Sequence, residues 1–168
     1  MKKDSLVIVL MGPMGCGKTT IGKMLAHELG WVFCDADDVH PEENIQKMAA
    51  GIALTDEDRK IWLERLHAKI QDWLGRAQNT VLACSALKQS YRDRLGVDQK
   101  RVKTVYLKGS FDLLSERVRN RRHPYMDNRL LKSQLDTLEE PVEGFRVDIS
   151  LSGERIVRAI VDGLKLAQ

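Results

Sequence analysis

The fold is decided by the stretch Leu6-Val7-Ile8-Val9-Leu10-Met11-Gly12-Pro13-Met14-Gly15-Cys16-Gly17-Lys18-Thr19. Its first six residues form a continuous apolar run, which is typical of a strand covered on both faces of a sheet. Residues 12–19 match the pattern G-x-x-x-x-G-K-[ST], and residues 18–29 carry the apolar stripe of a helix. A strand, a glycine-rich loop and a helix in this order predict a binding site for nucleotide phosphates.

The residue types in this loop match the physical demands of phosphate binding. Glycines let the backbone wrap around phosphate oxygens without interference from a Cβ atom. Lys18 would place its charge near the β- and γ-phosphates, and Thr19 would supply a hydroxyl to Mg²⁺. The alternative, a glycine-rich turn that arose by chance, does not explain the strand before it and the helix after it. The residues predicted to bind the nucleotide, ATP or GTP, are Gly12, Gly15, Cys16, Gly17, Lys18, Thr19 and Thr20.

Apolar runs and helical patterns alternate along the whole chain, which predicts an α/β protein with a parallel sheet and helices on both faces. A single domain over residues 1–168 accounts for this pattern, since no linker or internal repeat interrupts it. The predicted strands cover residues 6–10, 31–34, 80–84, 102–107 and 145–149. The predicted helices cover residues 18–29, 41–50, about 56–77, 111–121, 127–138 and 153–166.

Composition narrows the class of protein. The chain has 168 residues, of which 43% are hydrophobic and 30% charged, as in ordinary globular domains. The formal net charge of +3 is too small to indicate nucleic acid or an anionic membrane as the main partner. No apolar run approaches membrane-spanning length, and the three cysteines show no zinc spacing. We therefore expect a cytoplasmic protein.

Two carboxylates follow the predicted second strand. Asp35 and Asp37 are two residues apart, so in an extended segment they would project to the same side. Ligands of parallel sheets bind at the carboxyl ends of the strands, where both groups could face the γ-phosphate. One could hold a water molecule on Mg²⁺, and the other could accept the proton of an attacking hydroxyl. The alternative is a solvated acidic turn.

Several cations are candidates for binding an acidic acceptor or the nucleotide. Lys88 and Arg92 are four residues apart and would share one face of a short helix, although from spacing alone surface charge is the better explanation. Arg59 lies near the start of its helix, where the dipole disfavours a cation, and this hints at a ligand. The basic run over residues 117–124 predicts either a lid over ATP or a solvated helix face.

Three spaced motifs resemble the gluconokinase family, the small sugar-acid kinases related to shikimate kinase. Residues 35–59 are similar to D-G-D-x-x-H-P-x-x-N-x-x-K-M-x-x-G-x-P-L-x-D-x-D-R. Residues 84–92 are similar to C-S-A-L-K-x-x-Y-R, and residues 133–141 to S-Q-F-x-x-L-E-x-P. The resemblance implies a three-layer P-loop fold with strand order 2-3-1-4-5, a small lid at about residues 119–130, and homodimers as a common assembly.

The same resemblance implies ATP-dependent phosphorylation of a hydroxyl of a small acidic polyol, with D-gluconate as the leading acceptor. It assigns Thr19 and Asp35 to Mg²⁺, and Arg117 and Arg121 to the nucleotide. The implied catalytic residues are Lys18, Asp37 and Arg121. The residues implied to bind the acceptor are Asp37, His40, Arg59, Lys88, Arg92 and Gln134.

Four departures from the family pattern leave alternatives open. Ala36 stands in place of a glycine, Ile52-Ala53-Leu54 replaces x-P-L, and no proline precedes Trp62. Residues 122–127 replace a G-H-F-M-like lid. Another aldonate, a shikimate-like acid or a nucleotide therefore remains an alternative acceptor. A nucleotide-binding protein without catalysis is a further alternative, but it would not need both Asp35 and Asp37.

Overall fold

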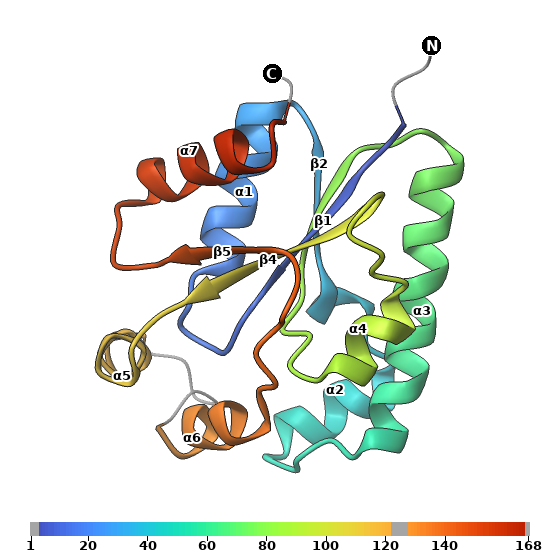
Figure 1. Ribbon diagram of the computed structural model, residues 1–168. Helices are drawn as coiled ribbons and strands as arrows, with labels where there is room; N and C mark the ends of the chain where they lie inside the picture. The colour runs from blue at the N-terminus through green and yellow to red at the C-terminus, as the bar shows by residue number, and fades with distance from the viewer. Residues whose placement is uncertain (1–3, 122–127, 167–168) are drawn as a thin grey trace.

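The computed structural model describes residues 4–121 and 128–166, which form one parallel sheet with helices on both sides (Figure 1). The strands lie in the order β2-β3-β1-β4-β5, and every neighbouring pair is parallel. This confirms the strand order that the family resemblance implied. The strands are β1 (Val7–Met11), β2 (Val32–Asp35), β3 (Thr80–Ala83), β4 (Val102–Lys108) and β5 (Phe145–Asp148).

The helices cover the two faces of the sheet separately. Figure 1 shows α1 and α7 on one side, and α3 with α4 on the other. The predicted boundaries are close to those observed, although residues 122–127 of the predicted lid lie outside the described residues. The helices are α1 (Lys18–Leu29), α2 (Glu42–Ala49), α3 (Asp56–Gly75), α4 (Gln89–Leu95), α5 (Phe111–Asn120), α6 (Asn128–Thr137) and α7 (Gly153–Gly163), with a short 3₁₀ helix, η1 (Ala36–Val39).

The side chains of β1 alternate between two cores. Val7, Val9 and Met11 pack with residues of α3, while Ile8 and Leu10 pack with residues of α1 and α7. All five side chains are fully buried. A central parallel strand buries both of its faces, and this explains the continuous apolar run at the start of the chain.

The helix starts predicted at residues 56 and 111 are confirmed, and side-chain caps stabilise both. In the capping box of α3, the amide of Asp58 donates to the Thr55 hydroxyl at 3.1 Å, and the amide of Thr55 donates to the Asp58 carboxylate at 3.0 Å. The amide of Leu113 likewise donates to Ser110 at the start of α5. Within the described residues, no helix is both long and apolar enough to span a bilayer.

Gly22 lets α1 approach the sheet closely. A Cβ atom at this position would lie 2.5 Å from Cε2 of Phe33 on β2. Gly75, at the end of α3, has no atom within 4 Å of such a Cβ. Both glycines lie in helices, but only Gly22 is closely packed at the position that a Cβ atom would occupy.

We predict that Gly22→Ala lowers the free energy of unfolding by about 1–2 kcal/mol, because overpacking against Phe33 outweighs the gain in helix propensity. Gly75→Ala is the matched control and should be neutral or stabilising by up to about 1 kcal/mol. Urea denaturation of both variants measures the difference. Equal stability of the two variants would contradict the close approach of α1 to β2.

Candidate active site

The loop between β1 and α1 depends on its glycines. Gly12, Gly15 and Gly17 have φ values of 146°, 81° and 97°, in the region that glycine adopts without strain. A Cβ atom at Gly12 would also lie 2.8 Å from the Cys16 sulfur and 3.0 Å from the Leu107 carbonyl oxygen. A side chain would therefore strain the backbone at all three positions, and at Gly12 it would also clash with neighbouring atoms.

The start of α1 is suited to an anion. Gly17 precedes the helix and has no side chain to cap its free N–H groups. Lys18 folds across the loop, and its Nζ donates to the carbonyl oxygens of Gly12 at 2.9 Å and Pro13 at 3.2 Å. The uncapped start of the helix, its dipole and this ammonium suit the binding of phosphates, and the loop with the start of α1 is called the phosphate cradle below.

Asp35 connects this cradle to the next loop. The hydroxyl of Thr19 donates to Oδ2 of Asp35 at 3.2 Å, and the amide of Asp37 donates to Oδ1 at 3.0 Å. The expectation of an extended segment at Asp35 and Asp37 is wrong, because Asp37 lies in η1 and Asp35 caps that helix. The two carboxyl groups are still neighbours, since a tight helical turn follows the strand directly.

The electrostatic setting of Asp37 differs from that of an ordinary surface carboxylate. Part of the Asp37 side chain is exposed to solvent, but surrounding protein atoms exclude much of the water from its carboxyl group. This desolvation raises the pKa of Asp37, and the negative charge of Asp35 raises it further, while Lys18 opposes both effects. Asp37 therefore lies within the electrostatic reach of both Asp35 and Lys18.

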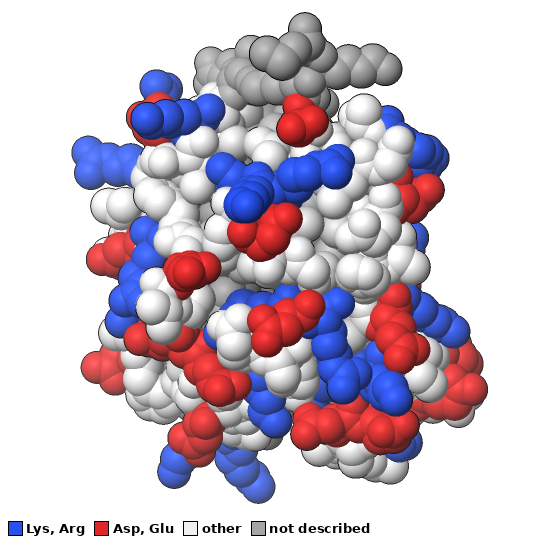
Figure 2. Space-filling view, turned by 45° about the vertical axis from the view of Figure 1, so that its right-hand side comes forward, with Lys and Arg blue, Asp and Glu red and all other residues white. Residues whose placement is uncertain are grey.

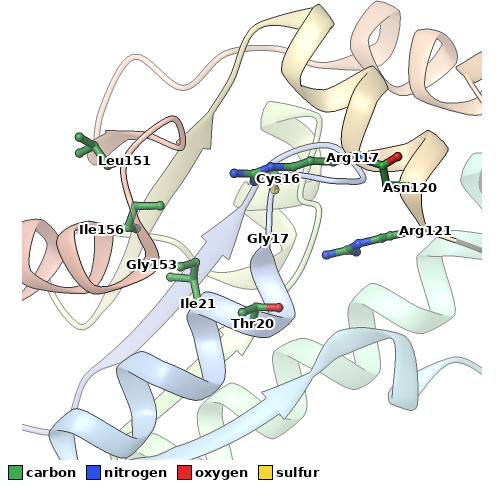
Figure 3. Close-up of a pocket in the computed structure, with 10 residues that line it drawn as sticks. All are labelled: Cys16, Gly17, Thr20, Ile21, Arg117, Asn120, Arg121, Leu151, Gly153 and Ile156. Carbon is green, nitrogen blue, oxygen red and sulfur yellow. The ribbon is translucent and has the colours of Figure 1, made fainter.

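A cavity of about 380 Å³ opens beside the loop (Figure 3). Arg117 of α5 lies over Cys16 and donates to the carbonyl oxygens of Gly15 at 3.3 Å and Ile149 at 2.9 Å. Arg121 points from the end of α5 toward the start of α1. The opposite wall is apolar and includes Leu151 and Ile156. Polar groups near the phosphate cradle and an apolar wall beside it suit a nucleotide with its base in this cavity.

A second group of charged side chains surrounds Tyr91. The guanidinium carbon of Arg59 and Nζ of Lys88 lie 5.8 and 5.5 Å from the centre of the Tyr91 ring. The hydroxyl of Tyr91 donates to Oδ1 of Asp56 at 2.7 Å, and the same oxygen lies 3.5 Å from Lys88 Nζ. Arg59, Lys88, Tyr91 and Asp56 are referred to below as the Tyr91 cluster.

His40 lies beside this cluster as a buried, neutral ring. It stacks on Trp62, with the ring centres 4.4 Å apart, and its Nδ1 is 3.2 Å from the amide nitrogen of Asn44. Burial lowers the pKa of His40 to about 4, and the nearby charge of Arg59 contributes in the same direction. Trp62 in turn donates from Nε1 to the carbonyl oxygen of Ala36 at 2.7 Å, which fixes η1 against α3.

Comparison with known proteins shows the family to which this chain belongs. The family model described as shikimate kinase matches residues 14–154. The thermoresistant gluconokinase of Escherichia coli strain K12 is 36% identical, with the match covering 96% of this chain and 95% of the relative. The chain belongs to the gluconokinase family. A gluconokinase structure from Sinorhizobium meliloti 1021 is 40% identical with a TM-score of 0.83, covering 98% of this chain and 94% of that chain. An unliganded sugar kinase structure from Janibacter sp. HTCC2649 is 37% identical with a TM-score of 0.87, covering 97% of this chain and 96% of that chain.

Two residues that the family resemblance assigned to the acceptor, Arg92 and Gln134, form hydrogen bonds to loops of this chain. Lys88 precedes α4 with an extended backbone, so the expectation that it shares a helix face with Arg92 is wrong. Arg92 is only 2% exposed and donates to the carbonyl oxygens of Ala86 at 2.7 Å and Glu139 at 2.8 Å. Oε1 of Gln134 accepts a hydrogen bond from the amide of Met14 at 2.7 Å and so supports the phosphate loop.

Several side chains of this candidate site were not predicted from the sequence. Tyr91 and Asp56 were noted only as letters of the family motifs, but they make the closest contact of the Tyr91 cluster. Trp62 and Asn44 position His40 and were assigned no role. Asn44, Asp56 and Tyr91 lie within the motifs that resemble the family pattern, and this was the feature of the sequence that could have indicated their roles. The contacts of Tyr91 with Asp56 and of Trp62 with Ala36 join residues 35 and 26 positions apart in the sequence, which no local pattern reveals.

The setting of His40 predicts a pH dependence of stability. Its pKa in the folded protein, about 4, is below the ordinary value of 6.5, so between these values the unfolded chain binds a proton that the folded chain does not. Lowering the pH from 6.5 to 4 should therefore destabilise the wild type relative to His40→Phe, by at most about 1.4 kcal/mol per pH unit. Denaturation at several pH values measures the slope, with His27→Gln as the control for loss of an exposed imidazole. Parallel profiles for wild type and His40→Phe would contradict a buried, neutral His40.

Proposed function

We propose that this protein catalyses the ATP-dependent phosphorylation of a sugar-acid hydroxyl, converting D-gluconate to 6-phospho-D-gluconate. The observation that carries the proposal is the short helix η1, which joins two sites. Asp37 lies at its start, beside Asp35 and within reach of the charge of Lys18. His40 directly follows the end of η1, and the charge of Arg59 in the Tyr91 cluster lowers the pKa of His40. A base between a phosphate cradle and a cationic pocket suits transfer of a phosphoryl group to an acidic acceptor.

The nucleotide part of the site would be formed by the loop and by α5. The amides at the start of α1 and the ammonium of Lys18 would hold the phosphates. Arg117 and Arg121 line the cavity beside the loop and would bind the nucleotide. Arg121 points toward the start of α1 and would stabilise charge on the phosphates. These residues support ATP as the phosphoryl donor, and a substrate pair of ATP and a sugar acid fits a cytoplasmic enzyme.

Thr19 and Asp35 fit a magnesium ion. Both present hard oxygen atoms, 3.2 Å apart, at the edge of the phosphate cradle. No group of three metal-binding carboxylate, histidine or cysteine side chains occurs in the part of the chain that the structure describes. Mg²⁺ does not require one, since it commonly takes one or two protein ligands along with phosphate oxygens and water. When bound, Mg²⁺ would neutralise charge that develops on the phosphate oxygens.

Asp37 is the residue that we assign as the general base. Its raised pKa makes it a stronger proton acceptor than an ordinary aspartate, and Asp35 holds its backbone amide in place. Arg59 and Lys88 would bind the carboxylate of the acceptor, and neutral His40 could exchange hydrogen bonds with an acceptor hydroxyl. Arg92 would act as a positioning residue, since it holds the carbonyl of Ala86, whose φ of 45° is unusual for a residue other than glycine.

The identity of the acceptor is tested by an ADP-release screen. Purified protein is assayed with ATP and Mg²⁺ against D-gluconate, other aldonates, shikimate and nucleoside monophosphates. We expect D-gluconate to give the highest kcat/KM. If another acid is phosphorylated and D-gluconate is not, that acid would take the place of D-gluconate as the proposed acceptor. ATP binding without phosphorylation of any acceptor would contradict the assignment as a kinase.

We predict that Asp37→Asn lowers kcat roughly 10²- to 10⁴-fold, since the amide cannot accept the proton of the attacking hydroxyl. The Kd for ATP should stay within about twofold of the wild-type value, because Lys18 and the loop amides remain. Asp38→Asn is the matched control, as it removes an exposed carboxylate from the same turn. Steady-state kinetics and nucleotide titration separate the two effects. Full activity of Asp37→Asn would remove Asp37 from the role of base.

A further inference from the structure

Asp56 holds the centre of the Tyr91 cluster. It is the first residue of α3, and 71% of its side chain is exposed. One of its oxygens, Oδ1, lies 2.7 Å from the Tyr91 hydroxyl, 3.5 Å from Lys88 Nζ and 3.9 Å from a guanidinium nitrogen of Arg59. A carboxylate of this protein thus occupies the place between two cations and a hydroxyl where a carboxylate of an acceptor would bind.

The cluster would be electrostatically unfavourable without this carboxylate. Arg59 and Lys88 both lie against the Tyr91 ring, so their positive charges are close together. The hydrogen bond from Tyr91 lowers the pKa of Asp56, and the charge of Lys88 lowers it further, which keeps Asp56 ionised. Figure 2 shows acidic and basic side chains side by side at the lower end of the molecule, where α2 and the start of α3 lie in Figure 1. The neighbouring Asp58 is paired with Lys47 at 2.8 Å, so Asp56 is the carboxylate that balances the cluster.

We propose that Asp56 is a specificity-determining residue, the internal counter-ion of the site that binds the carboxylate of the acceptor. Arg59 and Lys88 carry two positive charges and Asp56 one negative charge, which leaves one positive charge for the acceptor to neutralise. The inference rests on the proposed function, because it takes Arg59 and Lys88 as the residues that bind the acceptor.

Two consequences follow from this charge balance. First, Asp56 competes with the acceptor for the same donors, so it weakens the binding of every carboxylate. Second, the site matches an acceptor with one negative charge better than an acceptor with two, since the second charge would meet Asp56 without a free cation. Asp56 would thereby favour aldonates, which carry one carboxylate, over aldarates, which carry two.

The test is Asp56→Asn, which removes the charge and keeps the shape. The capping box of Thr55 and Asp58 stays in place, so the start of α3 should still form. Glu57→Gln is the matched control, because it removes the same charge from the same exposed helical turn. In the described part of the chain, Glu57 is not among the residues that contact Arg59, Lys88 or Tyr91.

The measurements are the Kd of D-gluconate by calorimetry, and kcat/KM for D-gluconate and D-glucarate. For Asp56→Asn we expect a Kd for D-gluconate roughly two- to fivefold lower, as loss of an exposed competing ion pair allows. The ratio of kcat/KM for D-glucarate to that for D-gluconate should rise, and Glu57→Gln should change neither quantity. A gain in affinity cannot result from misfolding. Asp56→Ser gives a second variant without the charge, should Asp56→Asn be unstable.

The outcomes separate this inference from the proposed function. An unchanged or raised Kd for D-gluconate in both Asp56 variants, or an equal change in Glu57→Gln, would overturn the role of Asp56 while wild-type turnover of D-gluconate stands. A wild-type protein that releases no ADP with D-gluconate would remove the basis of both.

Discussion

The hydrogen bond from Thr19 to Asp35 joins the two parts of the site. Thr19 belongs to the start of α1, and Asp35 ends β2, which lies two strands away from β1 in the sheet. The contact is available because all strands are parallel, so that their carboxyl ends meet at one edge. From Asp35 the chain turns directly into η1, whose position is fixed by the hydrogen bond from Trp62 to Ala36. The position of Asp37 relative to the phosphate cradle therefore depends on a strand end, a helix start and one tryptophan.

The phosphate cradle and the Tyr91 cluster shift the pKa of their carboxylates in opposite directions. Beside the phosphate cradle, Asp37 is raised in pKa by desolvation and by Asp35, which suits a group that must take up a proton. In the Tyr91 cluster, Asp56 is lowered in pKa by a hydrogen bond and two cations, which suits a group that stays ionised. Two carboxylates of the same type, 19 positions apart in the sequence, thus acquire opposite properties from their surroundings.

The basic residues show how far spacing alone can be trusted. The four-residue spacing of Lys88 and Arg92 predicted a shared helix face, but the helix begins one residue after Lys88. Lys88 therefore turns toward Asp56, whereas Arg92 is buried and binds the carbonyl oxygens of Ala86 and Glu139. Helix boundaries are the least certain part of a sequence-based prediction, and a shift of one residue was enough to separate these two cations.

The sequence by itself determined the strand, loop and helix from Leu6 to Leu29, the alternation of strands and helices, and the start of the long helix at residue 56. These features follow from local physics, since burial pattern, glycine conformation and cap chemistry act within a few residues. The order of the strands and the expected type of acceptor came from motif resemblance, not from local pattern. Only the tertiary structure decided that Asp37 lies in a helical turn, that Arg92 supports a loop, and that Asp56 sits between two cations. Those contacts join residues that are distant in sequence, and the packing of α3 and α4 against the sheet brings them together.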